Sequence, residues 1–438
     1  MRIQLIGHAS VLVSTGEIRL LSDPWLSGRA FAEGWEQSPL PYWRPEQLDC
    51  THLWISHEHP DHLSVETLRA VPEAKRRSIQ VVVQRSLTGE MSRFLRELGW
   101  GSVIELGHRE RHDLGGGVTV QLHQFGLVDS SLTVSRDAET VVLLNDCKPT
   151  RWGLRRLRQD VGSVSVLFDQ YSIAAWAGNP GDTDRYATRR KLVLDHLAQH
   201  VEMLDPELFV PYASSVRFCQ PDNVHMNDAV VTRAMVEQRL GGRNLLWLEP
   251  GQELDPRADP PVGLRPAAPT GSDVGTGQER DQEPDQQPAE ERAEPGPPII
   301  ELAELRVDEL LARTPTLLAR RLRPLGFRSA DDSFPPFVFD PQDALTAGAS
   351  ADCVVVVGGD AARAALGYRW GLETLSISGR FRLEGDESIF QQWKQLAAGV
   401  SAGLVCRPMR NWLLEPERRD FLRRRGFDFA MELVRKVR

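Results

Sequence analysis

One short segment constrains this chain more than any other: an apolar run that ends in three histidines and an aspartate within six positions. Thr51–Ile55 predicts a buried strand, and Pro60 prevents the strand from continuing. Imidazole and carboxylate groups are ligands that suit zinc, iron or manganese. Residues two positions apart in a loop can bind one ion together, and the remaining pair can bind a second. The segment therefore predicts a metal site with four ligands: His57, His59, Asp61 and His62.

The order His-x-His-x-Asp-His resembles the signature loop of the metallo-β-lactamase fold. The N-terminal runs Ile6–Val13 and Leu20–Leu26 resemble the opening hairpin of the branch with ascorbate-lactone lactonases, N-acyl-phosphatidylethanolamine phospholipases and CMP-sialic acid hydroxylases. This resemblance implies that Asp23 orients the ligating histidines without binding the metal itself. The alternative for Asp23 is a turn residue before a proline. His8 is either a second supporting residue or a structural histidine at a strand end.

The same resemblance implies an αββα sandwich over residues 1–250 and further metal ligands from later loops. Thr140–Cys147 reads as a buried strand that leads into Asp146, at the place where the family has an aspartate bridging two metals. A helix-cap or turn role is the alternative for Asp146. We therefore expect Asp61 and Asp146 to be the catalytic carboxylates, each both ligand and orienting group.

The loop after the predicted strand Val118–His123 leaves two candidates open. Hydrolases of the family usually carry a histidine there within a Gly-His turn, which this chain lacks. His123 is the nearest histidine, and Asp129 is the alternative. A carboxylate at this place would make the site harder and more suited to iron, as in the oxygen-activating members.

The run Phe209–Asp228 contains one histidine, His225, which we expect to bind the second metal; a surface role is the alternative. Several aromatic and basic side chains lie near the predicted ligands in sequence. They are candidates for a substrate pocket, against the simpler view that the aromatics are core residues and the arginine a surface charge: Tyr171, Trp176, Tyr212 and Arg217.

Composition narrows the class of protein. The chain has 438 residues, a formal net charge of −9 and 41% hydrophobic residues, which predict a folded protein with a large core. No apolar stretch approaches the length of a membrane span, and no signal peptide is evident, so we expect a cytoplasmic enzyme. The acidic balance argues against binding to nucleic acid. Five cysteines without a Cys-x-x-Cys pair argue against a disulfide framework.

A change in composition divides the chain. Residues 251–298 are rich in Pro, Asp, Glu, Gln and Gly, which predicts a disordered linker. Residues 299–438 are expected to form a smaller accessory α+β domain. Within it, Cys353–Gly359 and Leu375–Phe381 read as strands. The sequence does not predict the role of this domain or the oligomeric state.

The segments Val164–Trp176 and Leu144–Cys147 further resemble CMP-sialic acid hydroxylases and their bacterial relatives. The resemblance implies an oxygenase with two divalent metal ions, iron favoured over zinc or manganese, acting on a polar, nucleotide- or carrier-linked small molecule. Vertebrate hydroxylases carry a Rieske domain, whose paired Cys-x-His and Cys-x-x-His motifs are missing here, so a separate electron donor is expected. The alternatives are a zinc hydrolase of an ester, lactone or phosphodiester, and a non-catalytic metal-binding protein.

Overall fold

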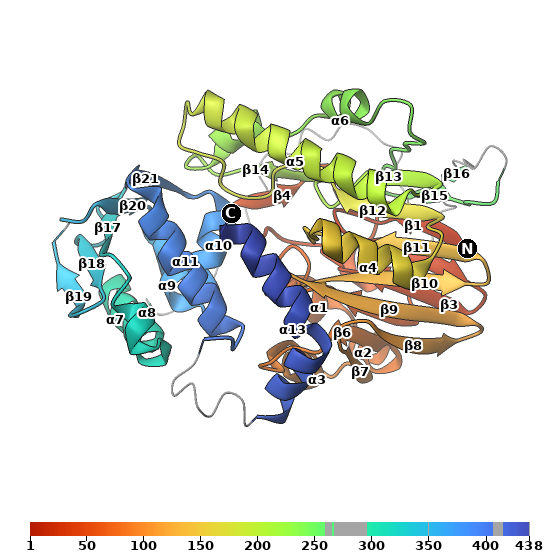
Figure 1. Cartoon of the computed structure of the whole chain (residues 1–438), viewed down its shortest axis with the longest axis horizontal. Coiled ribbons are helices and arrows are strands. Elements are labelled where there is room, and N and C mark those ends of the chain that lie inside the picture. Colours follow the sequence, from red (N-terminus) through yellow and green to blue (C-terminus); the bar gives the residue numbers. More distant parts are fainter. Residues whose placement is uncertain (259–264, 267–295, 349, 406–414, 438) are drawn as a thin grey trace.

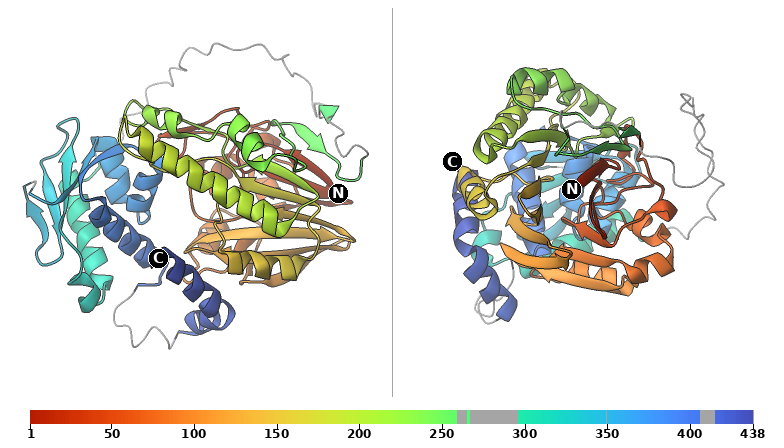
Figure 2. Two further views of the ribbon diagram at one scale, coloured as in Figure 1. Left: turned by 45° about the horizontal axis from the view of Figure 1, so that its top comes forward. Right: turned by 90° about the vertical axis from the view of Figure 1, so that its right-hand side faces the viewer.

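A computed structural model describes residues 1–258, 265–266, 296–348, 350–405 and 415–437. Two sheets lie face to face, with helices on both outer sides (Figure 1). A smaller domain with its own sheet lies at one end of this pair (Figure 2). The predicted αββα sandwich with a smaller α+β domain after it is confirmed.

The first sheet contains the predicted metal loop. Its strand order is β16-β15-β1-β2-β3-β5-β6-β7. The strands are β16 (Arg265–Pro266), β15 (Gln252–Leu254), β1 (Arg2–Leu5), β2 (Val11–Thr15), β3 (Ile18–Ser22), β5 (His52–Ile55), β6 (Gln80–Gln84) and β7 (Ser102–Leu106). Strands β3, β5, β6 and β7 run parallel to one another, and β2 runs antiparallel to its neighbours β1 and β3. The four residues of β5 are all buried, as the sequence predicted.

The second sheet supplies the later loops. Its order is β13-β12-β11-β10-β9-β8. The strands are β8 (Glu110–Gly115), β9 (Val118–Phe125), β10 (Asp129–Arg136), β11 (Glu139–Leu143), β12 (Val166–Gln170) and β13 (Leu208–Tyr212). Strands β11, β12 and β13 are parallel, so their carboxyl ends lie at one edge. Strand β10 runs antiparallel to β11 and therefore begins at that same edge.

Hydrophobic side chains hold the layers together. Ile3, Trp54, Phe168 and Tyr212 belong to the cluster between the two sheets. On the outer faces, separate clusters pack under α1 (Val65–Ala70) and α3 (Glu90–Glu97), and under α4 (Arg151–Val161), α5 (Thr183–Leu204) and α6 (Arg233–Leu240). Full burial of one large apolar side chain contributes about 1.5–3 kcal/mol, so these three clusters supply most of the driving force for stacking the sheets.

The predicted linker begins later than residue 251. Strand β15 lies inside that segment and pairs with β1, with Leu254 opposite Ile3. Leu254 is buried, and the Gly251 N–H donates to the Leu5 carbonyl at 2.7 Å. One well-placed leucine and a paired strand edge thus outweigh the polar composition of the surrounding residues. The rest of the predicted linker, apart from 255–258, 265–266 and 296–298, lies outside the described residues.

The C-terminal domain has a five-stranded sheet in the order β19-β18-β17-β20-β21. Its strands are β17 (Leu325–Ser329), β18 (Phe337–Asp340), β19 (Ala344–Ala347), β20 (Cys353–Val357) and β21 (Phe381–Gly385). Its helices are α7 (Ile299–Arg313), α8 (Thr316–Ala319), α9 (Gly359–Gly367), α10 (Gly371–Ser378) and α11 (Glu387–Ser401).

Of the two strands predicted in this domain, one is present. The first agrees with β20. The second, Leu375–Phe381, is wrong, because those residues form the end of α10 and a turn. Gly379 ends the helix in the left-handed conformation, with φ of 68°, and the next strand starts only at Phe381.

The C-terminal domain is not packed as a separate body. A single hydrophobic cluster contains its own core residues together with Trp25, Phe31, Trp176 and Phe218 of the first domain. The rings of Trp176 and Phe381 lie 5.2 Å apart across this boundary. The two domains therefore share one core, which fixes the C-terminal domain against the end of the sandwich.

The last helix, α13 (Pro416–Val437), returns to the first domain (Figure 1). The Asp428 carboxylate accepts hydrogen bonds from Trp152 Nε1 at 2.7 Å and from the His108 ring at 3.0 Å. His108 Nδ1 accepts from the Gln124 N–H, which leaves Nε2 as the donor to Asp428.

Among the described residues, no helix combines the length and apolar character needed to cross a membrane.

We predict that Asp428→Ala destabilises the docked α13. The substitution leaves the buried donors of His108 and Trp152 without an acceptor, which costs about 1–3 kcal/mol. Urea denaturation should show the loss. Arg423→Ala, at an exposed position of the same helix, is the control and should leave the midpoint unchanged. Equal midpoints for both variants would contradict the docking described here.

Candidate metal centre

The candidate site lies where strands of the two sheets end. Asp23 follows β3, Ser56 and His57 follow β5, and Asp146 follows β11. Asp129 is the first residue of β10 and lies at the same edge, because β10 is antiparallel to β11. Loops from both sheets therefore converge on one place, which is how residues far apart in sequence come together.

Three overlapping groups of side chains could each hold a metal ion, with ligand atoms within 4.8 Å of one another. The first is His57, His59 and Asp129; the second is His57, His62 and Asp146; the third is His8, Asp61 and His62. His57 and His62 each belong to two groups, and their rings are 4.3 Å apart. This overlap suits two neighbouring ions that share ligands.

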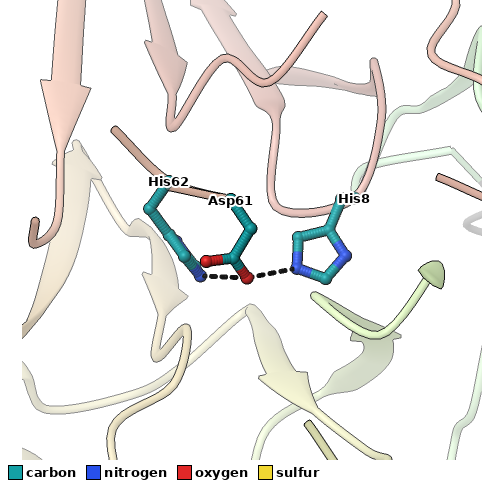
Figure 3. Close-up of side chains that lie close together, drawn as sticks. All are labelled: His8, Asp61 and His62. Atoms are coloured by element: carbon teal, nitrogen blue, oxygen red, sulfur yellow. Dashed lines mark ion pairs between the residues drawn. The ribbon is translucent and has the colours of Figure 1, made fainter. Parts of the chain in front are cut away.

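His8 is closer to the centre than the sequence predicted. Its Nε2 lies 3.2 Å from Asp61 Oδ2, and His62 Nε2 lies 3.4 Å from the same oxygen (Figure 3). The Asp61 carboxylate stands between the two rings (Figure 3). His8 thus takes the position of a candidate ligand, instead of supporting the ligands from behind.

Asp23 occupies the supporting position that was predicted for it. It is fully buried, and its oxygens accept hydrogen bonds from the Ser56 N–H at 2.7 Å and from the Ser56 hydroxyl and the His62 ring, each at 2.8 Å. The Asn145 side-chain amide donates to it as well. One carboxylate therefore ties together the ends of β3, β5 and β11.

These hydrogen bonds also set which ring nitrogens face the centre. Nδ1 of His62 bonds to Asp23, so its Nε2 is the ring nitrogen that faces Asp61 and Asp146 and is placed to bind a metal. The Ser56 hydroxyl donates to Asp23 and accepts from His57 Nδ1 at 2.9 Å, so His57 Nε2 likewise faces the cluster. An unprotonated ring nitrogen is what a metal ligand requires.

The polar atoms of the cluster fit metal ions better than they fit one another. Five of them are shielded from solvent and make no hydrogen bond in the described part of the chain: both ring nitrogens of His8, His59 Nε2, Asp61 Oδ1 and His62 Nε2. Two of the five, His8 Nε2 and His62 Nε2, have only the contact with Asp61 Oδ2 at 3.2 and 3.4 Å. Leaving a buried polar group unsatisfied costs about 1–3 kcal/mol. A cation bound by these atoms would satisfy them together, so the donor set fits a dinuclear metal centre.

The pKa values of the clustered histidines also fit a site that binds cations. Burial lowers the pKa of His57 well below its ordinary value, and the neighbouring His62 and His59 lower it further. Burial also opposes charge on His62, but Asp61, Asp146 and Asp23 outweigh it and hold its pKa well above the ordinary value. Three carboxylates around one ring create a demand for positive charge, which divalent cations would meet.

The carboxylates themselves divide into two kinds. Burial opposes ionisation of Asp146, but the charge and hydrogen bond of His62 outweigh it and lower its pKa to about 2. Burial raises the pKa of Asp129 to about 6, against the lowering effect of His59. Burial likewise raises the pKa of Glu58 to about 7. Glu373, from α10 of the C-terminal domain, adds to the raised pKa of Asp129, so this domain reaches the electrostatic surroundings of the site.

Of the two candidates left open for the third loop, the structure brings Asp129 to the cluster. Asp129 Oδ1 lies 4.0 Å from His57 Nε2. The ring of His123 instead pairs with Asp160 at 3.0 Å and lies 6.1 Å from that of His108. Residues alternate sides along β9, and His123 faces α4, which carries Asp160. Among the described residues, Asp129 belongs to one of the three candidate metal groups and His123 to none of them.

His225 is also not among the groups that could hold a metal. It lies in a short 3-10 helix, η2 (Val224–Ala229), and its Nε2 is 3.3 Å from the carbonyl oxygen of Gly178. This helix packs at the boundary with the C-terminal domain, where Met226 belongs to the shared core. The expectation that His225 binds the second metal disagrees with this placement, and His8 stands in the third group instead.

The four candidates for a substrate pocket have other roles. Trp176 belongs to the core shared by the two domains, and Tyr212 lies between the sheets, where its hydroxyl accepts from the Asn145 N–H at 3.2 Å. Tyr171 packs edge-on against Trp247, and Arg217 forms an exposed ion pair with Glu36. The simpler interpretation holds for all four, although Tyr212 does help to position the turn before Asp146.

Sequence reasoning missed the polar side chains that support the loops. The Gln84 side-chain amide donates to the Ser56 carbonyl at 3.0 Å, and the Ser130 hydroxyl donates to the same oxygen at 2.6 Å. Gln170 Nε2 donates to Asp146 Oδ1 at 2.9 Å. Ser56 directly follows the apolar strand β5, and Gln170 is the last residue of β12. These positions at strand ends were the available signal, but the partners of both side chains depend on the tertiary fold.

Comparison with known proteins agrees with the fold. Residues 2–127 match the family model described as a beta-lactamase superfamily domain. The αββα arrangement of the first domain agrees with this match, which covers the part of the chain that contains the metal loop.

The curated relatives match over the first domain. The chain is 27% identical over 249 residues to a Mycobacterium tuberculosis protein named as a Rieske 2Fe-2S iron-sulfur protein, which covers 52% of this chain and 46% of that protein. It is 27% identical over 251 residues to the cytidine monophosphate-N-acetylneuraminic acid hydroxylase of Danio rerio, covering 51% and 39%. The chain thus matches less than half the length of these relatives.

Among solved structures, CmlA, a diiron β-hydroxylase from Streptomyces venezuelae, matches with 20% identity and a TM-score of 0.41. The match covers 57% of this chain and 53% of that one. A novel metallo hydrolase from Ignicoccus hospitalis matches with 15% identity and a TM-score of 0.40, covering 58% and 97%.

The ligand assignment leads to a prediction with matched controls. Asp129→Ala and His8→Ala should each lower the metal-to-protein ratio, because each removes a candidate donor. His123→Ala and His225→Ala should leave that ratio unchanged. Elemental analysis of the four purified proteins measures it. A loss of metal in either control, with retention in its counterpart, would reverse the assignment for that loop.

A second prediction concerns Asp23. Asp23→Ala should weaken metal binding by roughly 10–100-fold, as removal of a residue that orients ligands usually does. His57→Ala should lose metal more completely, because it removes a direct donor to two of the groups. Competition with a chelator gives both affinities. If the two variants lose affinity equally, the supporting role of Asp23 is wrong.

Proposed function

We propose that this chain is a dinuclear-metal oxygenase, with iron as the metal, that hydroxylates or oxidises a small polar substrate. The proposed ligands are the seven clustered side chains His8, His57, His59, Asp61, His62, Asp129 and Asp146. A substrate linked to a nucleotide or a carrier is the class suggested by the resemblance to CMP-sialic acid hydroxylases.

One observation carries this proposal: the third loop offers the Asp129 carboxylate instead of the histidine usual in hydrolases of the family. With Asp61 and Asp146, the cluster then holds three carboxylates beside four imidazoles. Oxygen ligands favour harder, redox-active metals such as iron or manganese over zinc. The names of the curated relatives, which include hydroxylases, support the same class of reaction.

Two bound iron ions would supply the redox-active site for activating dioxygen. The residues of this chain have the remaining tasks. Asp23 and Ser56 fix the ring orientation of His62 and His57. Gln170 holds the Asp146 carboxylate, and Gln84 ties the loop of His57 to the turn before Asp129. These bonds keep the donors in place as the charge of the centre changes.

Hydroxylation consumes one substrate C–H bond, one dioxygen molecule, two electrons and two protons, and yields a hydroxyl group and water. We propose that the electrons come from a separate donor. Cys50 and His52 have the Cys-x-His spacing of half a Rieske site, but no Cys-x-x-His segment occurs in the sequence. This chain therefore lacks the ligands for a cluster of that type.

A metal-dependent hydrolase is the second candidate. The four imidazoles of the cluster suit zinc, and two zinc ions would acidify a bound water for attack on an ester, lactone or phosphodiester. In this case Asp61 and Asp146 would have the same orienting roles. The metal content and the need for oxygen separate the two candidates.

We predict that the protein purified with iron absorbs between the near-ultraviolet and the visible, and that reduction removes this absorbance. With a chemical reductant and the right substrate, it should consume oxygen faster than without substrate. Visible spectra and an oxygen electrode test this, with Asp146→Ala as the metal-deficient control. A colourless, zinc-loaded protein that cleaves a phosphodiester or lactone without oxygen would decide for the hydrolase.

A further inference from the structure

Helix α4, which covers part of the outer face of the second sheet, is rich in arginine although the whole chain has a net charge of −9. Four of its eleven residues are arginines: Arg151, Arg155, Arg156 and Arg158. Its one acidic residue is Asp160, which already binds Arg109 and His123. The helix therefore concentrates positive charge at one place on an acidic protein.

Three of these arginines lie on the side of α4 that faces solvent. Leu154 and Leu157 are fully buried against the sheet, whereas Arg151 and Arg155 are exposed and Arg158 is partly exposed. The spacing i, i+4 and i+7 places the three arginines on one helix face. We call them the arginine stripe. At a rise of 1.5 Å per residue, the stripe is roughly 10 Å long.

No carboxylate compensates the charge of the stripe in the described part of the chain. Arg151 and Arg155 form no ion pair or hydrogen bond with the described residues, and Arg158 donates to a backbone carbonyl. Arg156, beside the stripe, lies 5.7 Å from the ring centroid of Trp152. The positive charge of the stripe therefore remains available to a molecule that docks on the helix.

The stripe does not stabilise α4 itself. Arg155 lies one turn after Arg151, and like charges at this spacing destabilise a helix. Arg151 is also the first residue of α4, where a positive charge opposes the helix dipole. The helix is held instead by its buried leucines and by Thr150, whose hydroxyl accepts from the Gly153 N–H at 3.1 Å. Charge that weakens its own helix and has no acidic partner in it indicates a partner outside the chain.

The stripe begins close to the candidate metal centre. Asp146 follows β11, and only four residues separate it from Arg151 at the start of α4. Five steps of extended chain span at most about 18 Å, so the Cα atoms of these two residues lie within that distance. The segment between them is a continuous covalent path from a candidate ligand to the surface. Because electron transfer slows steeply with distance, this end of α4 is a favourable place for a redox partner.

Helix α13 lies beside α4 (Figure 1), joined to it by the hydrogen bond from Trp152 Nε1 to Asp428. The half-buried Trp152 thus lies at the border between the two helices, next to the stripe. Arginine and aromatic residues are enriched where proteins bind one another. The surroundings of the stripe therefore have the composition of a protein interface.

A negatively charged protein fits this surface better than a nucleic acid. The net charge of −9 repels a polyphosphate backbone, and a stripe of three arginines can neutralise only a few phosphates. Complexes between electron carriers, in contrast, have small interfaces and are steered by complementary charge. A short basic surface near a redox centre is suited to such a transient complex.

We propose that the arginine stripe of α4 is the docking surface for an acidic electron-transfer protein. The inference rests on the proposed function, because an oxygenase without a Rieske cluster takes its two electrons from outside the chain. In each encounter the reduced donor loses one electron and is oxidised, and one ferric ion of the centre becomes ferrous. Two encounters reduce both ions. Carboxylates of the donor bind the stripe and hold its redox group near the metal end of α4.

The test uses the full-length chain and, as the probe, a plant-type [2Fe–2S] ferredoxin, which is an acidic electron carrier. Surface plasmon resonance at low salt should show binding, and the affinity should fall at least tenfold when salt is raised to about 0.15 M, because screening weakens exposed charge pairs. A short DNA duplex should bind at least tenfold more weakly than the ferredoxin. Absence of ferredoxin binding at low salt, or equal binding of the duplex, would overturn the proposal.

Charge reversal locates the docking surface. The double variant Arg151→Glu, Arg155→Glu should lower ferredoxin affinity at least tenfold at low salt, with unchanged metal content. The control reverses two exposed arginines of other helices, Arg77→Glu in α2 (Glu73–Ser78) and Arg233→Glu in α6, and changes the net charge equally. The control should bind as the parent does. An equal loss in both double variants would show that only net charge matters and would refute the stripe.

A second measurement follows electron transfer in the iron-loaded protein. At low salt, reduced ferredoxin should remove the visible absorbance at least tenfold more slowly from the Arg151→Glu, Arg155→Glu variant than from the parent. Dithionite, a small reductant that needs no docking surface, should reduce both proteins at similar rates, which a damaged metal centre would not do. Equal rates with ferredoxin would count against the stripe.

The two proposals fail separately. A zinc-loaded, oxygen-independent protein that still binds ferredoxin through the stripe would refute the oxygenase and keep the docking surface. An iron protein with the expected spectrum, whose ferredoxin binding is unaffected by reversing the stripe, would keep the oxygenase and refute the docking surface.

Discussion

The structure of the candidate centre depends on the buried carboxylate of Asp23. It accepts hydrogen bonds from Ser56 and His62, which follow β5 of the first sheet, and from Asn145, which follows β11 of the second. Its backbone adopts a positive φ of 34°, a conformation that is unfavourable for aspartate and is held by these bonds. Because one group spans the two sheets, their stacking and the orientation of the histidine rings are set by the same interaction. The stability of the sandwich and the geometry of the donors are therefore coupled.

Much of this arrangement was predictable from local patterns. The apolar run before the metal motif predicted β5, and the candidate ligands His57, His59, Asp61, His62 and Asp146 lie together in the cluster. Such patterns succeed because a strand fixes the direction of its end, and parallel strands in one sheet end at one edge. The supporting position of Asp23 was implied by the family resemblance, and its place directly after β3 agrees with it. For these residues, the position in the sequence relative to a strand end is enough to predict the position at the edge of the sheet.

The errors arose where placement depends on distant packing. His225 seemed suited to the second metal, but η2 is held at the domain boundary, and His8 from the N-terminal hairpin lies in the cluster instead. Whether Asp129 or His123 faces the centre depends on the direction of side chains along β9 and β10. Leu375–Phe381 alternates apolar and polar residues and so predicted a strand, but Leu375 lies in α10 and packs with Phe381 into the core shared by the two domains. None of these contacts is encoded in a short window of sequence.

The return of α13 to the first domain changes what a fragment of this chain would be. Residues more than 300 positions apart, such as His108 and Asp428, are direct partners, and the core shared with the C-terminal domain includes Trp25 and Phe31 of the opening segment. A gene fragment cut at residue 250 would expose this apolar surface and remove β15 from its sheet. Engineering of the metal domain should therefore treat the whole chain as the minimal unit.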